Sequence, residues 1–151
     1  MTRSLPTPQV GWLAALAAPD RCSIIAGDAN SLALGDPEPP DWARLPAHLG
    51  VRYLQPDHPG QAPVADRSAL ALLRRAGFVD AAAVHGDLAP TVPAAGFPDA
   101  EFVPFRCDHV LLSPALAPGL TTYRVLDDDR TAHASDHLPV VVELADGVAV
   151  A

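Results

Sequence analysis

The sequence predicts an α/β domain, because short apolar runs of strand length share the chain with segments whose apolar residues recur at helical spacing. The chain has 151 residues, the length of one domain with a core of its own. Hydrophobic residues make up 49% of it, which is typical of globular proteins. No repeat or linker divides the chain, so we expect a single domain over residues 1–151.

The N-terminal part of the chain is expected to hold a helix followed by a strand. Thr7 and Pro8 are typical of a helix start, and Pro19 would end that helix. Residues 22–26 are apolar and predict a short buried strand. The next segment, residues 27–40, is rich in Gly, Pro and Asp and predicts a loop.

The middle of the chain is expected to alternate between helices and loop. Residues 41–49 favour a helix with Pro46 as its weak point, and residues 50–63 contain three prolines and favour a loop. Asp66 is expected to cap a second helix that ends at Gly77.

The C-terminal half is expected to consist mainly of strands. Residues 78–84 are apolar enough for one strand. Residues 85–105 are rich in proline and predict a long irregular connection, and loops of that length are often functional. Three further strands are expected at 107–112, 121–126 and 138–144.

Charge and cysteine content narrow the classes of function. The net charge is −8, which disfavours nonspecific nucleic-acid binding through phosphate neutralisation. No apolar run approaches the ~20 residues that span a bilayer, and the N-terminus lacks the apolar stretch of a secretory signal, so we expect a cytoplasmic protein. The two cysteines, Cys22 and Cys107, are expected to be buried free thiols.

Polar residues at the ends of three apolar runs carry the functional signal. The run that ends at Ala26 leads into Gly-Asp-Ala-Asn, residues 27–30. Arg-Cys-Asp-His, residues 106–109, opens the run that begins at Val110, and Ser-Asp-His, residues 135–137, precedes the last strand.

Each of these patterns also has an ordinary interpretation. Gly-Asp-x-Asn is a common turn sequence, since Asp and Asn favour turns. Asp108 could simply cap a strand, and His137 alone would more often be a structural histidine than a ligand. His109 is expected to point outward with no role.

In order and rough spacing, the three motifs resemble the closing motifs of the endonuclease/exonuclease/phosphatase superfamily, which is DNase I-like and metal-dependent. Residues 76–81, Ala-Gly-Phe-Val-Asp-Ala, are similar to a further segment of that family. The resemblance implies a four-layer α/β sandwich, with two mixed sheets face to face and flanking helices. This chain would form the C-terminal half of that sandwich.

The resemblance also implies a role for each site residue. Asp28 would orient or deprotonate the attacking water, and Asn30 would contact the phosphate. Asp108 would pair with His137, and Asp136 would bind the metal ion. Phosphate-ester hydrolysis needs a positioned water, a Lewis acid and charge stabilisation, which these residues could serve with Mg²⁺ or Mn²⁺.

Local chemistry supports these roles. If the backbone is extended, Asn30 lies on the same side as Asp28, and its amide can donate to a phosphate oxygen. A carboxylate beside His137 would favour the protonated imidazole, which binds an oxyanion well.

The chain departs from the family by lacking its N-terminal half. That half carries a glutamate that is a main metal ligand, and none of the three glutamates here (Glu38, Glu101 and Glu143) stands in its position. The chain could be a truncated product, half of a split enzyme, or a domain that has lost catalysis and acts as a binding module.

The missing half affects the expected partners. A half sandwich would leave a sheet face uncovered, so we expect self-association or a partner chain. The acidic charge and the absence of lysine favour a small phosphoester or a phospholipid head group over long DNA as the substrate.

Overall fold

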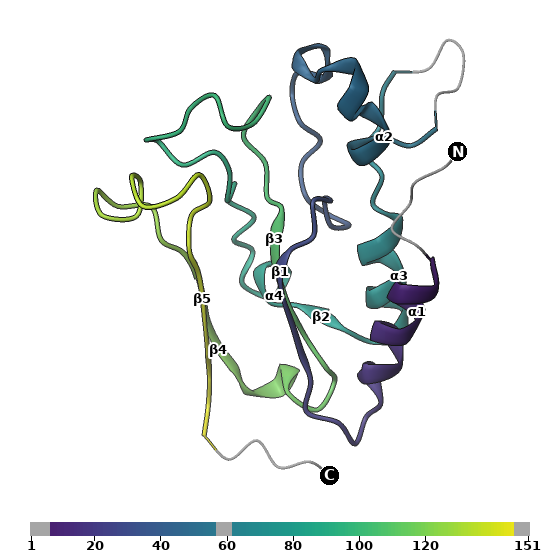
Figure 1. Cartoon of the computed structure of the whole chain (residues 1–151). Helices are drawn as coiled ribbons and strands as arrows, with labels where there is room; N and C mark the ends of the chain where they lie inside the picture. The colour runs from purple at the N-terminus through teal and green to yellow at the C-terminus, as the bar shows by residue number, and fades with distance from the viewer. Residues whose placement is uncertain (1–6, 57–61, 147–151) are drawn as a thin grey trace.

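The structure is a computed structural model that describes residues 7–56 and 62–146. It has three layers, which are a pair of helices, a central sheet and a two-stranded hairpin (Figure 1). The helices are α1 (Thr7–Ala14), α2 (Gly50–Tyr53), α3 (Ser68–Ala76) and α4 (Ala81–His85). The strands are β1 (Ile24–Asp28), β2 (Val79–Asp80), β3 (Asp108–Leu112), β4 (Leu120–Val125) and β5 (Val140–Leu144). This mixture of helices and sheets confirms the α/β prediction.

The central layer is a three-stranded antiparallel sheet in the order β1-β3-β2. Successive side chains of a strand point to opposite faces, so β3 contributes to two cores. Leu111 packs with Val10 of α1 and with Leu70 and Leu73 of α3 on one face. Val110 packs against the other layer on the opposite face.

The third layer is the antiparallel hairpin β4–β5. Tyr123 of β4 is buried with Ala81 and Ala82 of α4, and Val142 of β5 packs against the same cluster. Both sheets within the described residues are therefore antiparallel, whereas the resemblance implied mixed sheets.

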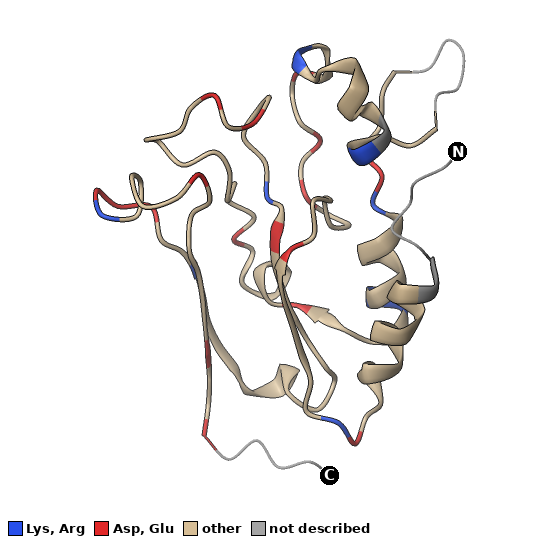
Figure 2. Ribbon diagram, viewed as in Figure 1, with Lys and Arg blue, Asp and Glu red and all other residues tan. Residues whose placement is uncertain are grey.

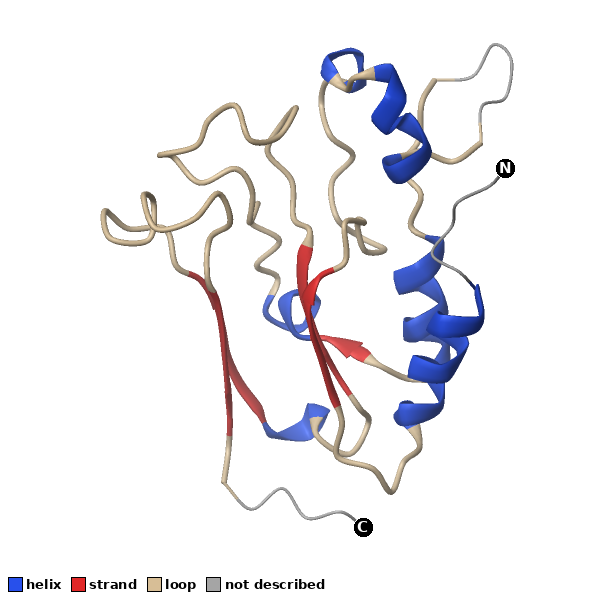
Figure 3. Cartoon of the chain, viewed as in Figure 1, coloured by secondary structure: helices blue, strands red, loops and turns tan. Residues whose placement is uncertain are grey.

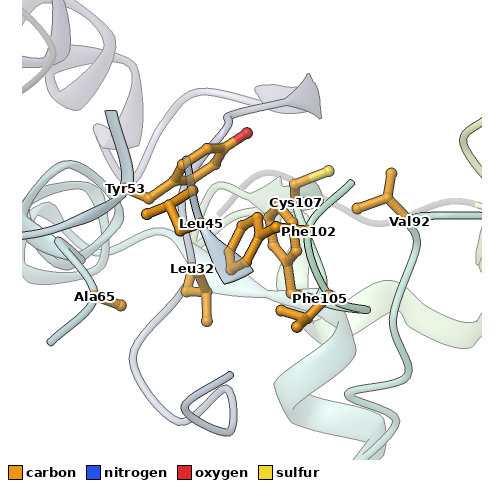
Figure 4. Close-up of a cluster of buried hydrophobic side chains, with 9 residues drawn as sticks. Leu32, Leu45, Tyr53, Ala65, Val92, Phe102, Phe105 and Cys107 are labelled. Carbon is orange, nitrogen blue, oxygen red and sulfur yellow. The ribbon is translucent and has the colours of Figure 1, made fainter. Parts of the chain in front are cut away.

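A third apolar cluster fastens the long loops next to the start of β3 (Figure 4). The rings of Tyr53, Phe102 and Phe105 lie 5.5–5.6 Å apart in tilted or edge-on arrangements. Such aromatic pairs contribute about 0.5–1.5 kcal/mol each beyond their buried area. Cys107 lies in this cluster, so the loops are anchored beside the residue that follows.

The helix boundaries agree with the sequence signals at two places. The first helix runs over α1 and one 3₁₀ turn, Ala15–Ala17, and ends before Pro19. The N-cap residue of α3 is Arg67 rather than the expected Asp66, whose carboxylate accepts the Ser68 amide at 2.9 Å. Gly77 ends the helix as expected, with φ of 116°, in the left-handed region.

Two expected elements have a different form. The strand expected over 78–84 is a strand only in β2, and α4 follows because the Asp80 carboxylate accepts the Ala82 amide and starts a helix of strong helix formers. The helix expected over 41–49 consists of two 3₁₀ turns that Pro46 separates, and α2 lies within the segment expected to be loop.

The first strand is more exposed than expected. The strand expected over 22–26 lies at 24–28, and Ile24 is 52% exposed because β1 is the edge of its sheet. Cys22, which precedes β1, is exposed, which contradicts the expectation of a buried thiol, whereas the burial of Cys107 confirms it. Within the described ranges, no helix has the length and apolar character needed to cross a membrane.

Candidate functional site

Antiparallel pairing brings two of the expected site residues to one end of the central sheet. Asp28 is the last residue of β1, Asp108 is the first of β3, and the two are cross-strand partners. Figure 2 shows acidic residues at this end of the two strands, and Figure 3 shows that the segments leading to it are mostly loop. His137 lies just before β5, and its Nδ1 is 2.8 Å from Oδ2 of Asp108. The pairing of Asp108 with His137 is therefore present in the structure.

Thr91 holds this end of the sheet in place, and no sequence motif indicated this role. Its fully buried hydroxyl accepts the amides of Cys107 at 3.1 Å and Asp108 at 3.2 Å. Its carbonyl accepts the amide of Leu138 at 2.8 Å. One residue of the long connection thus fixes both Asp108 and the segment that carries His137.

The electrostatics of the site favour a protonated His137. Partial burial acts to lower its pKa, but the hydrogen bond and charge of Asp108, with the charges of Asp28 and Asp136, raise the pKa above its ordinary value of 6.5. Three carboxylates from three separate segments therefore act on one imidazole.

Asn30 adopts a turn rather than an extended conformation. Its φ is 46°, and its backbone amide donates to Oδ1 of Asp28 at 2.7 Å, which is the geometry of an Asx turn. The extended backbone on which the expected placement of Asn30 beside Asp28 depended is therefore absent. The Asp28 carboxylate supports the turn and lies at the site end at the same time.

Asp136 is exposed beside His137. The Ser135 hydroxyl donates to Oδ1 of Asp136 at 3.2 Å and accepts the His137 amide at 3.1 Å. The Asp136 carbonyl accepts the Ala94 amide at 2.8 Å, so the long connection anchors this backbone as well. The carboxylate itself faces outward and is available to a ligand.

His109 is buried, which contradicts the expectation that it points outward. It is 3% exposed, and its Nε2 lies 2.8 Å from the Ser31 carbonyl, to which it donates. Burial and the neighbouring Arg106 lower the pKa of His109. A neutral imidazole thus holds the loop that follows Asp28.

Arg106 forms a buried charged cluster that sequence reasoning missed. Its Nε and Nη2 donate to Oδ1 of Asp36 at 2.9 and 2.6 Å, and its Nη1 and Nη2 donate to the Asp80 carboxylate at 3.1 and 2.7 Å. The Asp36 carboxylate also accepts the Ala33 amide at 2.6 Å. The cluster therefore ties the loop after β1 to the starts of β3 and α4.

Cys107 places a thiol against the Asp108–His137 pair. Its Sγ lies 3.5 Å from Oδ2 of Asp108 and 3.9 Å from Nδ1 of His137. Among the described residues, these three form the group of potential metal ligands. Burial, and then the charges of Asp108 and Asp28, strongly raise the pKa of the thiol, so it is protonated at neutral pH in the absence of a metal.

The layers define the fold as a mixed α/β sandwich with antiparallel sheets. No model of a known protein family and no curated protein sequence matches the chain. Among solved structures, the chain is similar to an AP endonuclease from Archaeoglobus fulgidus, with a TM-score of 0.56 and 21% sequence identity. The similarity covers 90% of this chain and 50% of that chain, so this chain spans about half the length of that protein. At this identity, the likeness shows the fold.

Proposed function

We propose that the chain carries the phosphate-binding part of a metal-dependent phosphoesterase site. The observation that supports this most is the Asp108–His137 hydrogen bond at 2.8 Å, beside Asp28 and at the end of a DNase I-like sheet. His137, protonated through its carboxylate neighbours, would bind a phosphoryl oxygen, and Asp108 would orient its ring. Asp28 would accept a proton from the attacking water.

The remaining roles concern the phosphate and a metal ion. The side-chain amide of Asn30 would donate to a phosphate oxygen. Asp136 offers an exposed carboxylate, the donor that Mg²⁺ and Mn²⁺ prefer, at a point where the Asp28 and Asp108 carboxylates already concentrate negative charge. A bound ion would supply Lewis-acid stabilisation of the phosphoryl oxygens.

Hydrolysis of chromogenic phosphate esters tests this proposal. The purified chain is assayed with a phosphodiester, a phosphomonoester, a phospholipid and an abasic-site DNA duplex, each with Mg²⁺, with Mn²⁺ and with a chelator. Small esters or the lipid head group should be preferred over DNA. Asp108→Asn and His137→Gln should lower the rate by about 10²–10⁴-fold, as expected for loss of a proton-transfer or charge-stabilising group.

Asp129→Asn is the matched control, because Asp129 is exposed in a loop before the site. This variant should keep the wild-type rate. Equal rates in Asp108→Asn, His137→Gln and the control would contradict the proposal.

A second function remains open because the chain spans about half of the similar protein. The group of potential metal ligands in the described residues contains one thiol and no second hard carboxylate besides Asp108, so magnesium would rely on few ligands from this chain. A noncatalytic binding module is the alternative. Complete absence of hydrolysis with either metal would favour it.

Exposed apolar side chains support association with another chain. Ile24 at the free edge of β1 is 52% exposed, and Val84 of α4 is 58% exposed. We therefore expect a second copy or a partner chain to cover such exposed side chains, either of which would bury apolar area. Sedimentation velocity should show a dimer or larger species, and a concentration-independent monomer would contradict this expectation.

A further inference from the structure

The donor atoms of Cys107, Asp108 and His137 form a small triangle at the site. Sγ and Oδ2 are 3.5 Å apart, Sγ and Nδ1 are 3.9 Å apart, and Oδ2 and Nδ1 are 2.8 Å apart. The catalytic roles proposed above use the carboxylate and the imidazole but leave the thiol without a function. The thiol is the feature that needs a separate explanation.

This triangle is close to one face of a zinc tetrahedron. With Zn–S near 2.3 Å and Zn–N or Zn–O near 2.0–2.1 Å, ligand atoms in a tetrahedral site lie about 3.3–3.6 Å apart. The two separations that involve sulfur match this range to within about 0.4 Å. The carboxylate and imidazole would need to separate by about 0.5 Å, as two bonds to the metal replace their hydrogen bond.

The donor types and the charge balance favour a thiophilic ion over magnesium. Thiolate and imidazole are ligands that zinc prefers, whereas magnesium prefers oxygen donors. One thiolate, one carboxylate and one neutral imidazole balance the charge of a divalent ion, and a partly buried site tolerates a neutral assembly best. Ligands that suit zinc thus lie directly beside the Asp136 carboxylate, which suits magnesium.

The burial of the three side chains also suits metal entry. The His137 and Asp108 side chains are 32% and 19% exposed, so an ion can reach them from solvent. Cys107 is 2% exposed and closes the site from the interior. The fourth position would remain on the solvent side, where a water molecule can occupy it.

We propose that Zn²⁺ binds through Sγ of Cys107, Oδ2 of Asp108 and Nδ1 of His137 and withdraws the Asp108–His137 pair from phosphate chemistry. On binding, the thiol and Nδ1 of the imidazolium each release a proton to solvent, and the imidazole keeps its other proton on Nε2. The metal site stands independently of hydrolysis, whereas its inhibitory effect rests on the proposed function.

Titration with Co²⁺ tests the metal site directly, because a cobalt–thiolate bond gives a charge-transfer absorption in the near ultraviolet. The wild-type chain should show this band, and Zn²⁺ should displace it. Cys22→Ser is the matched control, since Cys22 is exposed just before β1, at the opposite end from Asp28, and this variant should keep the band. Cys107→Ser should lose it.

A second variant keeps the test decisive if Cys107→Ser fails to fold. His137→Gln retains the thiol and changes a side chain that is 32% exposed. Loss of this direct ligand should weaken Zn²⁺ binding by more than the roughly 10- to 100-fold that loss of a second-shell partner costs. No band in the wild type, a band retained in Cys107→Ser, or unchanged affinity in His137→Gln would overturn the site.

The inhibitory effect has a separate readout. Micromolar Zn²⁺ should suppress magnesium-dependent hydrolysis in the wild type and in Cys22→Ser, and much less in Cys107→Ser. Equal inhibition of wild type and Cys107→Ser would overturn this effect. If the wild type does not hydrolyse any ester, the proposed function fails while the cobalt spectra still decide the metal site.

Discussion

Two charged groups next to the start of β3 differ in how far their side chains are exposed to solvent. The Arg106–Asp36 pair is closed to solvent, with both side chains 1% exposed, and Asp80 completes the cluster. The Asp108–His137 pair, two residues along the chain, is open, with side chains 19% and 32% exposed. The closed cluster uses its polar atoms within the fold, whereas the open pair retains atoms for a ligand. Two neighbouring positions, one just before β3 and one at its first residue, therefore have different exposure to solvent.

The largest expected effect comes from breaking the closed cluster. Arg106→Ala would leave Asp36 and Asp80 buried without their cation, which typically costs about 3–5 kcal/mol. The matched control is Arg124→Ala, because Arg124 pairs with Glu143 at 3.8 Å in an exposed position. Its loss should cost about 1 kcal/mol or less. Urea unfolding measures the loss of stability in both variants. Similar losses would show that the closed cluster contributes no more than an exposed ion pair.

A smaller loss is expected where Thr91 joins the two regions. Thr91→Val keeps the shape of the side chain but removes the acceptor of the Cys107 and Asp108 amides. A buried donor without a partner costs about 1–3 kcal/mol, so we expect a loss of about 2 kcal/mol or more. Thr121→Val, at an exposed position, should change the free energy of unfolding by only a few tenths of the loss expected for Thr91→Val. An unchanged free energy of unfolding in Thr91→Val would show that Thr91 does not hold the two regions together.

The two histidines should respond to pH with opposite signs. The folded-state pKa of His109 lies below the ordinary 6.5, so the unfolded chain binds more protons and stability falls as pH drops below about 6.5. The slope from this group can reach about 1.4 kcal/mol per pH unit. Urea unfolding between pH 7 and 5 should show that slope, and His109→Gln should flatten it. An equally steep slope in the variant would assign it to other groups.

The smallest expected change concerns the open pair. The pKa of His137 is raised, so its contribution to stability is present below 6.5 and is lost as pH rises through the folded-state pKa. Asp108→Asn should return that pKa toward 6.5 and cost about 1 kcal/mol or less, because the pair is partly exposed. NMR titration of the imidazole checks the first point. An unchanged titration would show that Asp108 does not control His137.

The family resemblance predicted the pairing of Asp108 with His137, whereas local patterns showed only that each residue lies at the boundary of an apolar run. Strand position was clear from those runs, and antiparallel pairing of β1 with β3 then placed Asp28 opposite Asp108. The family resemblance supplied the link to His137. The roles of Asp28, Asn30, Asp108, Asp136 and His137 stay predictions.

The burial of Arg106 and His109 could not be predicted, because their partners lie far along the chain. Asp36 is 70 residues from Arg106, and Ser31 is 78 residues from His109. A local pattern shows a charged or polar residue beside a strand and favours exposure. The helix α4 did carry a local signal, since Asp80 before three alanines and Gly86 after them mark a helix start and stop.

The register of β1 against β3 has a consequence for how the chain reaches its working form. Sliding β1 by one residue would turn Asp28 to the other face of the sheet, and sliding it by two would carry it roughly 7 Å past Asp108. Either misaligned sheet could satisfy its backbone hydrogen bonds and still lack the paired carboxylates. Under the proposed function, hydrolysis at this end would depend on correct alignment of β1 with β3, because only the observed register pairs Asp28 with Asp108.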